Sequence, residues 1–292
     1  MLVGVFATVF AAEWELSLDA NAMFALNNYS DNWTGGDAGG INWTANIDGL
    51  AEKQLAEWLN NKNLLQLSFG QTHIQKAETG HWLVPEKSTD LIDFETIFRF
   101  TLHSFVDPYV AGRLQSQFYD GRNKLNKRYF NPIKLTESAG VARVLLKEEK
   151  REWTARLGFG VRQYIDRDAM VGGGDFPGDW IGIGTIETQT SNDGGIEFVS
   201  ELRTPLAGDK ISYNTRLSVF EALFNSDSDE LVGMPNEDYW KAPDIEWDHT
   251  FAANITEYLM VNLYIQILYD KEISLRGSHK ETISLGLTYK LF

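Results

Sequence analysis

Apolar and polar residues alternate along most of this chain. From Trp14 to Leu26 every even-numbered position is apolar, whereas Glu15, Ser17 and Asp19 are polar. A period of two residues predicts β-strands with one apolar and one polar face. The same alternation predicts further strands near 41–48, 65–70, 92–102, 153–162, 211–219, 245–254, 261–270 and 283–291. Segments 108–118, 134–146 and 194–205 alternate less cleanly and bring the expected number of strands to about twelve.

The connections between these strands alternate in length. Long ones are predicted near 27–40, 77–87, 119–131, 167–193, 224–242 and 270–280, and short ones near 55–63, 103–107, 147–151, 206–209 and 255–258. Outer-membrane barrels combine short periplasmic turns with long extracellular loops. The hydrocarbon core of a membrane offers no hydrogen-bond partners to backbone N–H and C=O groups, so strands can cross it only in a closed barrel, where they pair with one another. The pattern predicts an all-β, antiparallel transmembrane barrel over 12–292.

The two ends of the chain agree with export to the outer membrane of a Gram-negative bacterium. Residues 1–11 are apolar and end in small residues, as in a secretory signal peptide. They lack a positive first region, so we expect the true start of the signal peptide to lie upstream. At the other end, Phe292 supplies the terminal aromatic residue that is usual in such barrels, although it is out of phase with Leu291 and Tyr289.

Several segments resemble a known family. The first long loop contains Asn32-Trp33-Thr34-Gly35-Gly36, and the last strand contains Leu285-Gly286-Leu287-Thr288-Tyr289-Lys290. Together with segments 87–90 and 263–270, they resemble an uncharacterised family of Gram-negative outer-membrane β-barrels, classed as a domain of unknown function. The resemblance spans about 14–292 and implies an outer-membrane barrel without established catalytic residues. Family members usually end Tyr-Lys-Phe, and this chain has one extra residue there.

Composition limits the alternatives. The chain contains 41 Asp and Glu against 26 Lys and Arg, which gives a formal net charge of −15 and argues against nucleic-acid binding. Its mean hydropathy is −0.27, and no apolar run is long enough for a membrane-spanning helix. Cysteine is absent, which excludes disulfides, thiolate metal sites and cysteine nucleophiles.

The polar faces of the predicted strands carry both signs of charge. In a barrel of about twelve strands, long side chains can meet across the lumen. We therefore expect cross-strand ion pairs that fill the interior, with a narrow water path as the alternative. The candidate lumen-lining residues are Asp93, Glu95, Arg99, Arg113, Arg156, Arg162, Arg216, Glu246 and Asp248.

The long loops are rich in tryptophan and contain one basic segment. These residues either bind a partner or fold inward and cap the barrel mouth, and we favour the cap. The basic segment either contacts lipopolysaccharide phosphates or attracts acidic neighbouring loops. The candidate contact residues are Trp33, Trp82, Trp180, Trp240, Arg122, Lys124, Lys127 and Arg128. Expected partners are outer-membrane lipid, lipopolysaccharide and other envelope proteins.

No motif points to catalysis or to a cofactor. The chain has no Gly-x-Ser-x-Gly elbow, and Ser218 and Ser284 lie on the opposite phase from His249. The segment Asn225–Glu230 has oxygen side chains at calcium-ligand spacing, but Glu230 replaces the glycine of such loops. We therefore expect no enzyme, cofactor or metal. The leading hypothesis is a structural or accessory barrel of an envelope assembly, followed by a narrow porin-like channel and then by a lipid hydrolase.

Overall fold

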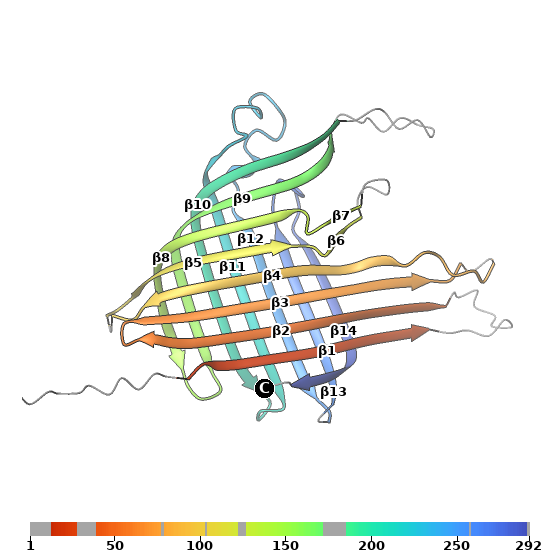
Figure 1. The fold of residues 1–292 in the computed structure, drawn as a ribbon, viewed down its shortest axis with the longest axis horizontal. Helices are drawn as coiled ribbons and strands as arrows, with labels where there is room; N and C mark the ends of the chain where they lie inside the picture. The colour runs from red at the N-terminus through yellow and green to blue at the C-terminus, as the bar shows by residue number, and fades with distance from the viewer. Residues whose placement is uncertain are drawn as a thin grey trace, which may run out of the picture.

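The computed structural model describes residues 13–27, 39–76, 79–102, 104–121, 127–171, 185–256 and 258–290. Among them, twelve antiparallel strands form one closed barrel, in the order β1-β14-β13-β12-β11-β10-β9-β8-β5-β4-β3-β2 (Figure 1). The predicted fold and number of strands are confirmed. The strands are β1 (Glu15–Asn27), β2 (Gly40–Ala56), β3 (Leu59–Ile74), β4 (Glu86–Phe100), β5 (Asp107–Ser116), β8 (Ile133–Lys147), β9 (Glu152–Val171), β10 (Thr185–Leu206), β11 (Ile211–Asn225), β12 (Asp244–Asn254), β13 (Leu259–Tyr269) and β14 (Ser278–Lys290).

The alternation of polar and apolar residues corresponds to the inner and outer faces of the barrel wall. In one row around the wall, neighbouring strands pair Asp48 with Gln66, Gln66 with Asp93, and Asp93 with Gln115. The row beside it pairs Leu65 with Phe94, and Phe94 with Leu114. Successive side chains of a strand point to opposite faces, so the polar row lines the lumen and the apolar row faces outward.

The alternation of short and long connections is also confirmed, with shifted bounds. The turn between β2 and β3 contains only Glu57 and Trp58, because the polar residues Asn60 and Asn61 are already paired in β3. Strands β9 and β10 extend to Val171 and from Thr185, into the predicted loop 167–193. β9 and β10 continue to pair with each other beyond the points where their other neighbours, β8 and β11, stop pairing.

The loop between β5 and β8 has structure of its own. It contains a two-stranded ribbon made of β6 (Tyr119–Asp120) and β7 (Arg128–Tyr129). A short 3-10 helix, η1 (Tyr239–Lys241), lies before β12. None of the helices in the described residues is long and apolar enough to cross a membrane. The expected signal peptide at 1–11 and the terminal Phe292 lie outside the described residues.

Candidate functional site in the barrel lumen

Glu95 is the centre of a charged cluster that joins opposite walls of the barrel. It projects from β4, and its side chain is 5% exposed. Arg156 of β9 donates a hydrogen bond to Glu95 Oε1, and Arg216 Nη1 of β11 lies 2.9 Å from Glu95 Oε2. Four strands separate β4 from β11 along the shorter way around the wall, so the Arg216 contact crosses the lumen.

Three further ion pairs extend this cluster. Arg113 binds Asp93 through two nitrogens, with Nε at 2.9 Å from Oδ1 and Nη2 at 2.5 Å from Oδ2. Arg216 also donates to Glu201, and Glu201 Oε2 lies 3.9 Å from Lys62 Nζ. A bidentate arginine–carboxylate pair has fixed geometry and is stronger than a neutral hydrogen bond. We call the whole set the lumen network: Lys62, Asp93, Glu95, Arg113, Arg156, Glu201 and Arg216.

Arg162 forms a second bridge, nearer the long-loop end of the barrel. Its guanidinium lies 2.7 Å from Asp244 and 3.3 Å from Asp193. It also stacks over the Phe220 ring, with 3.7 Å between the guanidinium carbon and the ring centroid. Arg99 projects inward near the short-turn end and forms no ion pair with the described residues.

Four further inward acids lie on a different part of the wall. Asp19 and Asp48 are directly opposite each other on β1 and β2. On β12, Glu246 accepts a hydrogen bond from Gln266 at 3.1 Å, and Asp248 accepts one from the Tyr264 hydroxyl at 2.6 Å. Asp48, Glu246 and Asp248 form no ion pair with the side chains that the structure describes. We call the four carboxylates the acidic wall: Asp19, Asp48, Glu246 and Asp248.

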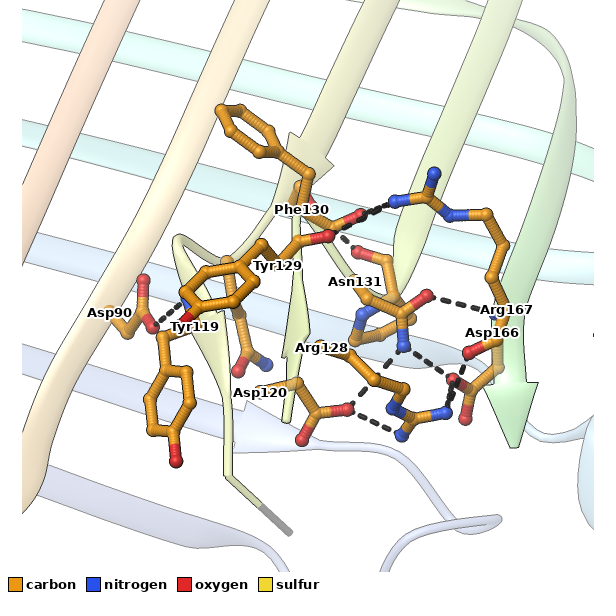
Figure 2. Close-up of polar contacts among 12 residues, drawn as sticks. Asp90, Tyr119, Asp120, Arg128, Tyr129, Phe130, Asn131, Asp166 and Arg167 are labelled. Atoms are coloured by element: carbon orange, nitrogen blue, oxygen red, sulfur yellow. Dashed lines mark hydrogen bonds and ion pairs between the residues drawn. The ribbon is translucent and has the colours of Figure 1, made fainter. Parts of the chain in front are cut away.

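A second polar cluster holds the β6–β7 ribbon on the barrel rim. Arg128 binds Asp120 at 2.5 Å and Asp166 at 2.8 Å, and Asn131 Nδ2 donates to Asp166 at 2.6 Å (Figure 2). Asp120 and Asn131 are each 1% exposed. The backbone amide of Arg167 donates to Asn131 Oδ1 at 2.8 Å. We call this the rim cluster: Asp120, Arg128, Asn131, Asp166 and Arg167.

Asp90 ties the start of the same ribbon to β4. Its two carboxylate oxygens accept hydrogen bonds from the backbone amides of Phe118, at 2.6 Å, and Tyr119, at 3.0 Å. Lys87 bridges Asp90 and the Tyr119 carbonyl, at 3.1 and 2.6 Å. With the rim cluster, these contacts anchor the loop to both β4 and β9.

The candidate loop residues have different surroundings. Arg128 is a correction: its side chain is 10% exposed, because two acids bind it, so it is not a surface contact here. Lys127 is exposed. Trp82 packs against His73, with ring centroids 4.9 Å apart, and the ring of Trp240 lies beneath Lys241. Trp33, Trp180, Arg122 and Lys124 lie outside the described residues.

A polar pocket of about 310 Å³ lies at the long-loop end. Its walls include Asp193, Asp227, Asn236 and Glu272. Partial burial, and then the neighbouring carboxylates led by Asp193, raise the pKa of Glu272 to about 7. The segment with calcium-ligand spacing borders this pocket, but Asn225 Oδ1 and Asp227 Oδ1 both accept local hydrogen bonds. Within the described residues, no group of three or more acids or histidines is arranged around a metal position.

The outward face of the barrel is mostly apolar. Phe24, Leu26 and Ile283 are 63%, 69% and 77% exposed. Apolar surface this extensive marks an interaction site or a membrane-facing surface. Glu137 is an exception: it pairs with Gly112 and Val161 in the outward-facing row and is exposed. It lines a surface groove of about 530 Å³ with Thr96, and it forms no hydrogen bond or ion pair with the described residues.

Sequence reasoning missed Glu137 and most of the rim cluster. A strict period of two through 134–146 places Glu137 on the outward face, where an acid interrupts the apolar pattern. That interruption was the signal in the sequence for this residue. The hydrolase alternative gains no support from His249. Its Nδ1 is hydrogen-bonded to the Tyr213 hydroxyl at 2.9 Å, on the outward face.

Comparison with known proteins gives one family match. Residues 24–121 are similar to a family described as Protein of unknown function (DUF3078). The match covers about a third of the chain and includes the first predicted long loop. That the Asn-Trp-x-x-Gly-Gly segment is a family signature stays a prediction. A search of curated proteins gave no significant match.

Solved structures with a similar arrangement include outer-membrane barrels. The translocator domain of the autotransporter NalP from Neisseria meningitidis is 9% identical, with 98% of this chain and 90% of that chain covered and a TM-score of 0.39. An outer-membrane channel from Pseudomonas putida F1 is 15% identical, with 99% and 98% covered and a TM-score of 0.42. The β-domain of the Bordetella autotransporter BrkA is 11% identical, with 96% and 98% covered and a TM-score of 0.34. At these identities and TM-scores, the matches assign no activity to the chain.

Proposed function

We propose that this protein is an integral barrel of the outer membrane of a Gram-negative bacterium. The support comes from the chain itself: its twelve strands close into one barrel, its outward face is apolar, and its inward face is polar. In this proposal the apolar face contacts outer-membrane lipid and lipopolysaccharide. Separation of inner and outer membranes by density, followed by detection of the protein, tests the location.

We further propose that the barrel is a non-catalytic structural or accessory subunit of a cell-envelope assembly. The observation that carries this proposal is the lumen network, in which Glu95 connects β4 with β9 and β11. The side chains of Asp93, Glu95 and Arg156 are at most 8% exposed, so water reaches very little of them. A lumen filled at this level leaves no wide path for solutes.

Planar-bilayer recording of the purified barrel tests the closed lumen. We expect no stable conductance from the wild type. Glu95→Ala removes both central ion pairs and leaves Arg156 and Arg216 to repel each other, so we expect this variant to conduct. Glu149→Ala, in the exposed turn between β8 and β9, is the matched control and should stay silent. Sizeable steady conductance from the wild type would reject the proposal.

The acidic wall favours a narrow cation channel as the second candidate. Asp48, Glu246 and Asp248 form no ion pair with the described side chains, and the hydrogen-bond donors to Glu246 and Asp248 are the neutral side chains of Gln266 and Tyr264. In the strand register, Asp248 lies opposite Arg216 of β11 and Asp19 opposite Lys290 of β14. Cations would be favoured along such a wall and anions excluded. This candidate predicts a small cation-selective current in the wild type that Asp48→Asn reduces. Reversal potentials measured in a salt gradient distinguish a cation-selective current from a non-selective leak.

A further inference from the structure

The barrel closes between β1 and β14 over a short stretch only. Among the residues that the structure describes, five pairs join these strands, from Asp19–Lys290 to Met23–Gly286. By contrast, β1 pairs with β2 over its whole length, and β14 pairs with β13 from Ser278 onward. Within the described residues, Phe24–Asn27 therefore pair on one side only, and so do Ser278–Leu285. We call these two segments the open edges.

The point where the seam opens is defined by close contacts. Gly286 lies against β1: a Cβ at this position would be 2.6 Å from the Ala22 carbonyl oxygen. The Ser284 hydroxyl donates to the Met23 sulfur just above it. In Figure 1 the end of β14, in dark blue, lies beside β1, in red.

Beyond Met23, β1 is exposed on both of its faces. Phe24 and Leu26 are exposed on the outward side, and Ala25 and Asn27 are exposed on the inward side. On β14, the inward-phase residue Thr282 is exposed as well as Ile283. A strand inside a closed wall would have both backbone edges covered, so this exposure agrees with the missing pairs.

Open strand edges are costly in a membrane. Unpaired N–H and C=O groups find no hydrogen-bond partner in hydrocarbon, and an acyl chain cannot supply one. An extended polypeptide can, because strand addition satisfies the backbone of an edge directly. The chemistry of the open edges therefore calls for a polypeptide rather than a lipid.

We propose that the open edges bind an extended strand of a partner polypeptide. Its apolar side chains would lie beside Phe24, Leu26 and Ile283, and its polar side chains would alternate with them toward the lumen. The β1 edge is four residues long and the β14 edge eight, so the docked strand is short. This inference rests on the membrane location proposed above and is independent of whether the lumen conducts.

Disulfide trapping tests the opening, because the chain contains no cysteine. Ala22 and Leu287 are paired across the closed part of the seam, so A22C/L287C should oxidise readily. Continuing the same register would pair Leu26 with Ile283. Cysteines whose Cα atoms are more than about 7 Å apart cannot be bridged, so we expect L26C/I283C to form ~10-fold less disulfide. Equal yields from the two folded barrels would mean a closed seam and overturn the proposal.

Peptide binding tests the occupant. The probe is a synthetic peptide of residues 278–290 with a photoreactive group, added to the wild-type barrel in phospholipid nanodiscs. We expect cross-links to Phe24–Asn27 and not to Leu157, which faces outward in the closed wall on β9. A backbone N-methylated peptide keeps the side chains but cannot pair, and it should cross-link at least ~10-fold less.

Three outcomes of the peptide experiment would contradict strand addition. Equal cross-linking by the two peptides would mean an apolar contact without backbone pairing. Absence of peptide cross-links in a barrel that runs as a dimer on native gels would mean that a second copy of this chain covers the edge. Cross-linking to Leu157 as strong as to the β1 edge would mean nonspecific adhesion. Failure of the proposed outer-membrane location would be detected separately, by the membrane fractionation described above.

Discussion

Glu95 on β4 and Arg216 on β11 meet across the barrel lumen, with Arg216 Nη1 at 2.9 Å from Glu95 Oε2. Arg156 binds the other oxygen of the same carboxylate. Removing one partner of a buried ion pair leaves the other charge without compensation and costs about 3–5 kcal/mol. We expect Glu95→Gln to lower the free energy of unfolding by about this amount, measured by urea unfolding in lipid vesicles.

The control for Glu95→Gln is Glu149→Gln, in an exposed turn, which should change stability by less than about 0.5 kcal/mol. The double variant Glu95→Gln/Arg216→Gln should lose less stability than the sum of the losses in the two single variants. Each single variant leaves the other residue charged and without this partner, whereas the double variant removes both charges of the pair. Additive losses would mean that the two residues do not interact.

Gly158 leaves room for the buried side chain of Tyr109. A Cβ at residue 158 would be 2.4 Å from the Ala139 carbonyl oxygen and 2.7 Å from the Tyr109 hydroxyl, and Tyr109 is 1% exposed. We expect Gly158→Ala to destabilise the barrel by about 1–3 kcal/mol, as overpacking does. Gly112→Ala is the matched control, since its Cβ would meet only Thr96 Cγ2 at 3.9 Å. Equal unfolding midpoints for the two variants would contradict this packing.

Alternation was sufficient to predict the barrel, because a strand with one face in lipid and one in the lumen must alternate along its length. It also predicted which charges lie inside: Asp93, Glu95 and Arg113 all project inward. It could not predict which charges pair. Glu95 and Arg216 are 121 residues apart, and their contact depends on how the closed wall brings β4 opposite β11.

The rim cluster shows the same limit. The basic loop and its acidic surroundings were visible in the sequence, and attraction between them was one of the two interpretations. The sequence did not show which acids bind Arg128, because Asp166 lies in a segment that continues β9 beyond the expected end of the strand. The length of β9 at the rim depends on its pairing with β10, and the local pattern of apolar and polar residues does not predict that length.

Asn131 should control the order of the β6–β7 ribbon. Its amide links Asp166 and the backbone of Arg167, and it is 1% exposed. Loss of buried hydrogen bonds costs about 1–3 kcal/mol. We therefore expect Asn131→Ala to speed trypsin cleavage at Lys127 about tenfold or more while the barrel stays folded. Lys87→Met tests the other anchor, and Asn236→Ala, at the pocket wall, is the control. Unchanged cleavage in Asn131→Ala would mean that the ribbon is held elsewhere.

The polar pocket at the long-loop end should respond to pH. Partial burial and nearby carboxylates raise the pKa of Glu272 to about 7 from its ordinary value of 4.5. A raised acid pKa means that the folded loops favour the protonated form, so their stability is full below pH 4.5 and falls as the pH rises through 7. We expect faster hydrogen exchange, corrected for intrinsic rates, in 226–243 and 270–277 at pH 8 than at pH 5.

Glu272→Gln should remove most of this pH dependence, because glutamine stays neutral throughout. Glu230→Gln changes an exposed carboxyl of the adjacent loop and should leave the dependence in place. If the two variants behave alike, the pH response comes from another group of the pocket, such as Asp193.

Glu137 should reduce the stability of the barrel in lipid. It projects outward from β8, between the strand ends Ile133 and Lys147, beside Gly112 and Val161. A carboxyl group that faces hydrocarbon without a partner is costly, although acids cost less than basic residues at the same depth. We expect Glu137→Leu to raise the free energy of unfolding in phospholipid vesicles by about 1 kcal/mol. Glu230→Leu, outside the strands, should give no gain. A loss of stability in Glu137→Leu would show that the carboxyl group has a stabilising partner.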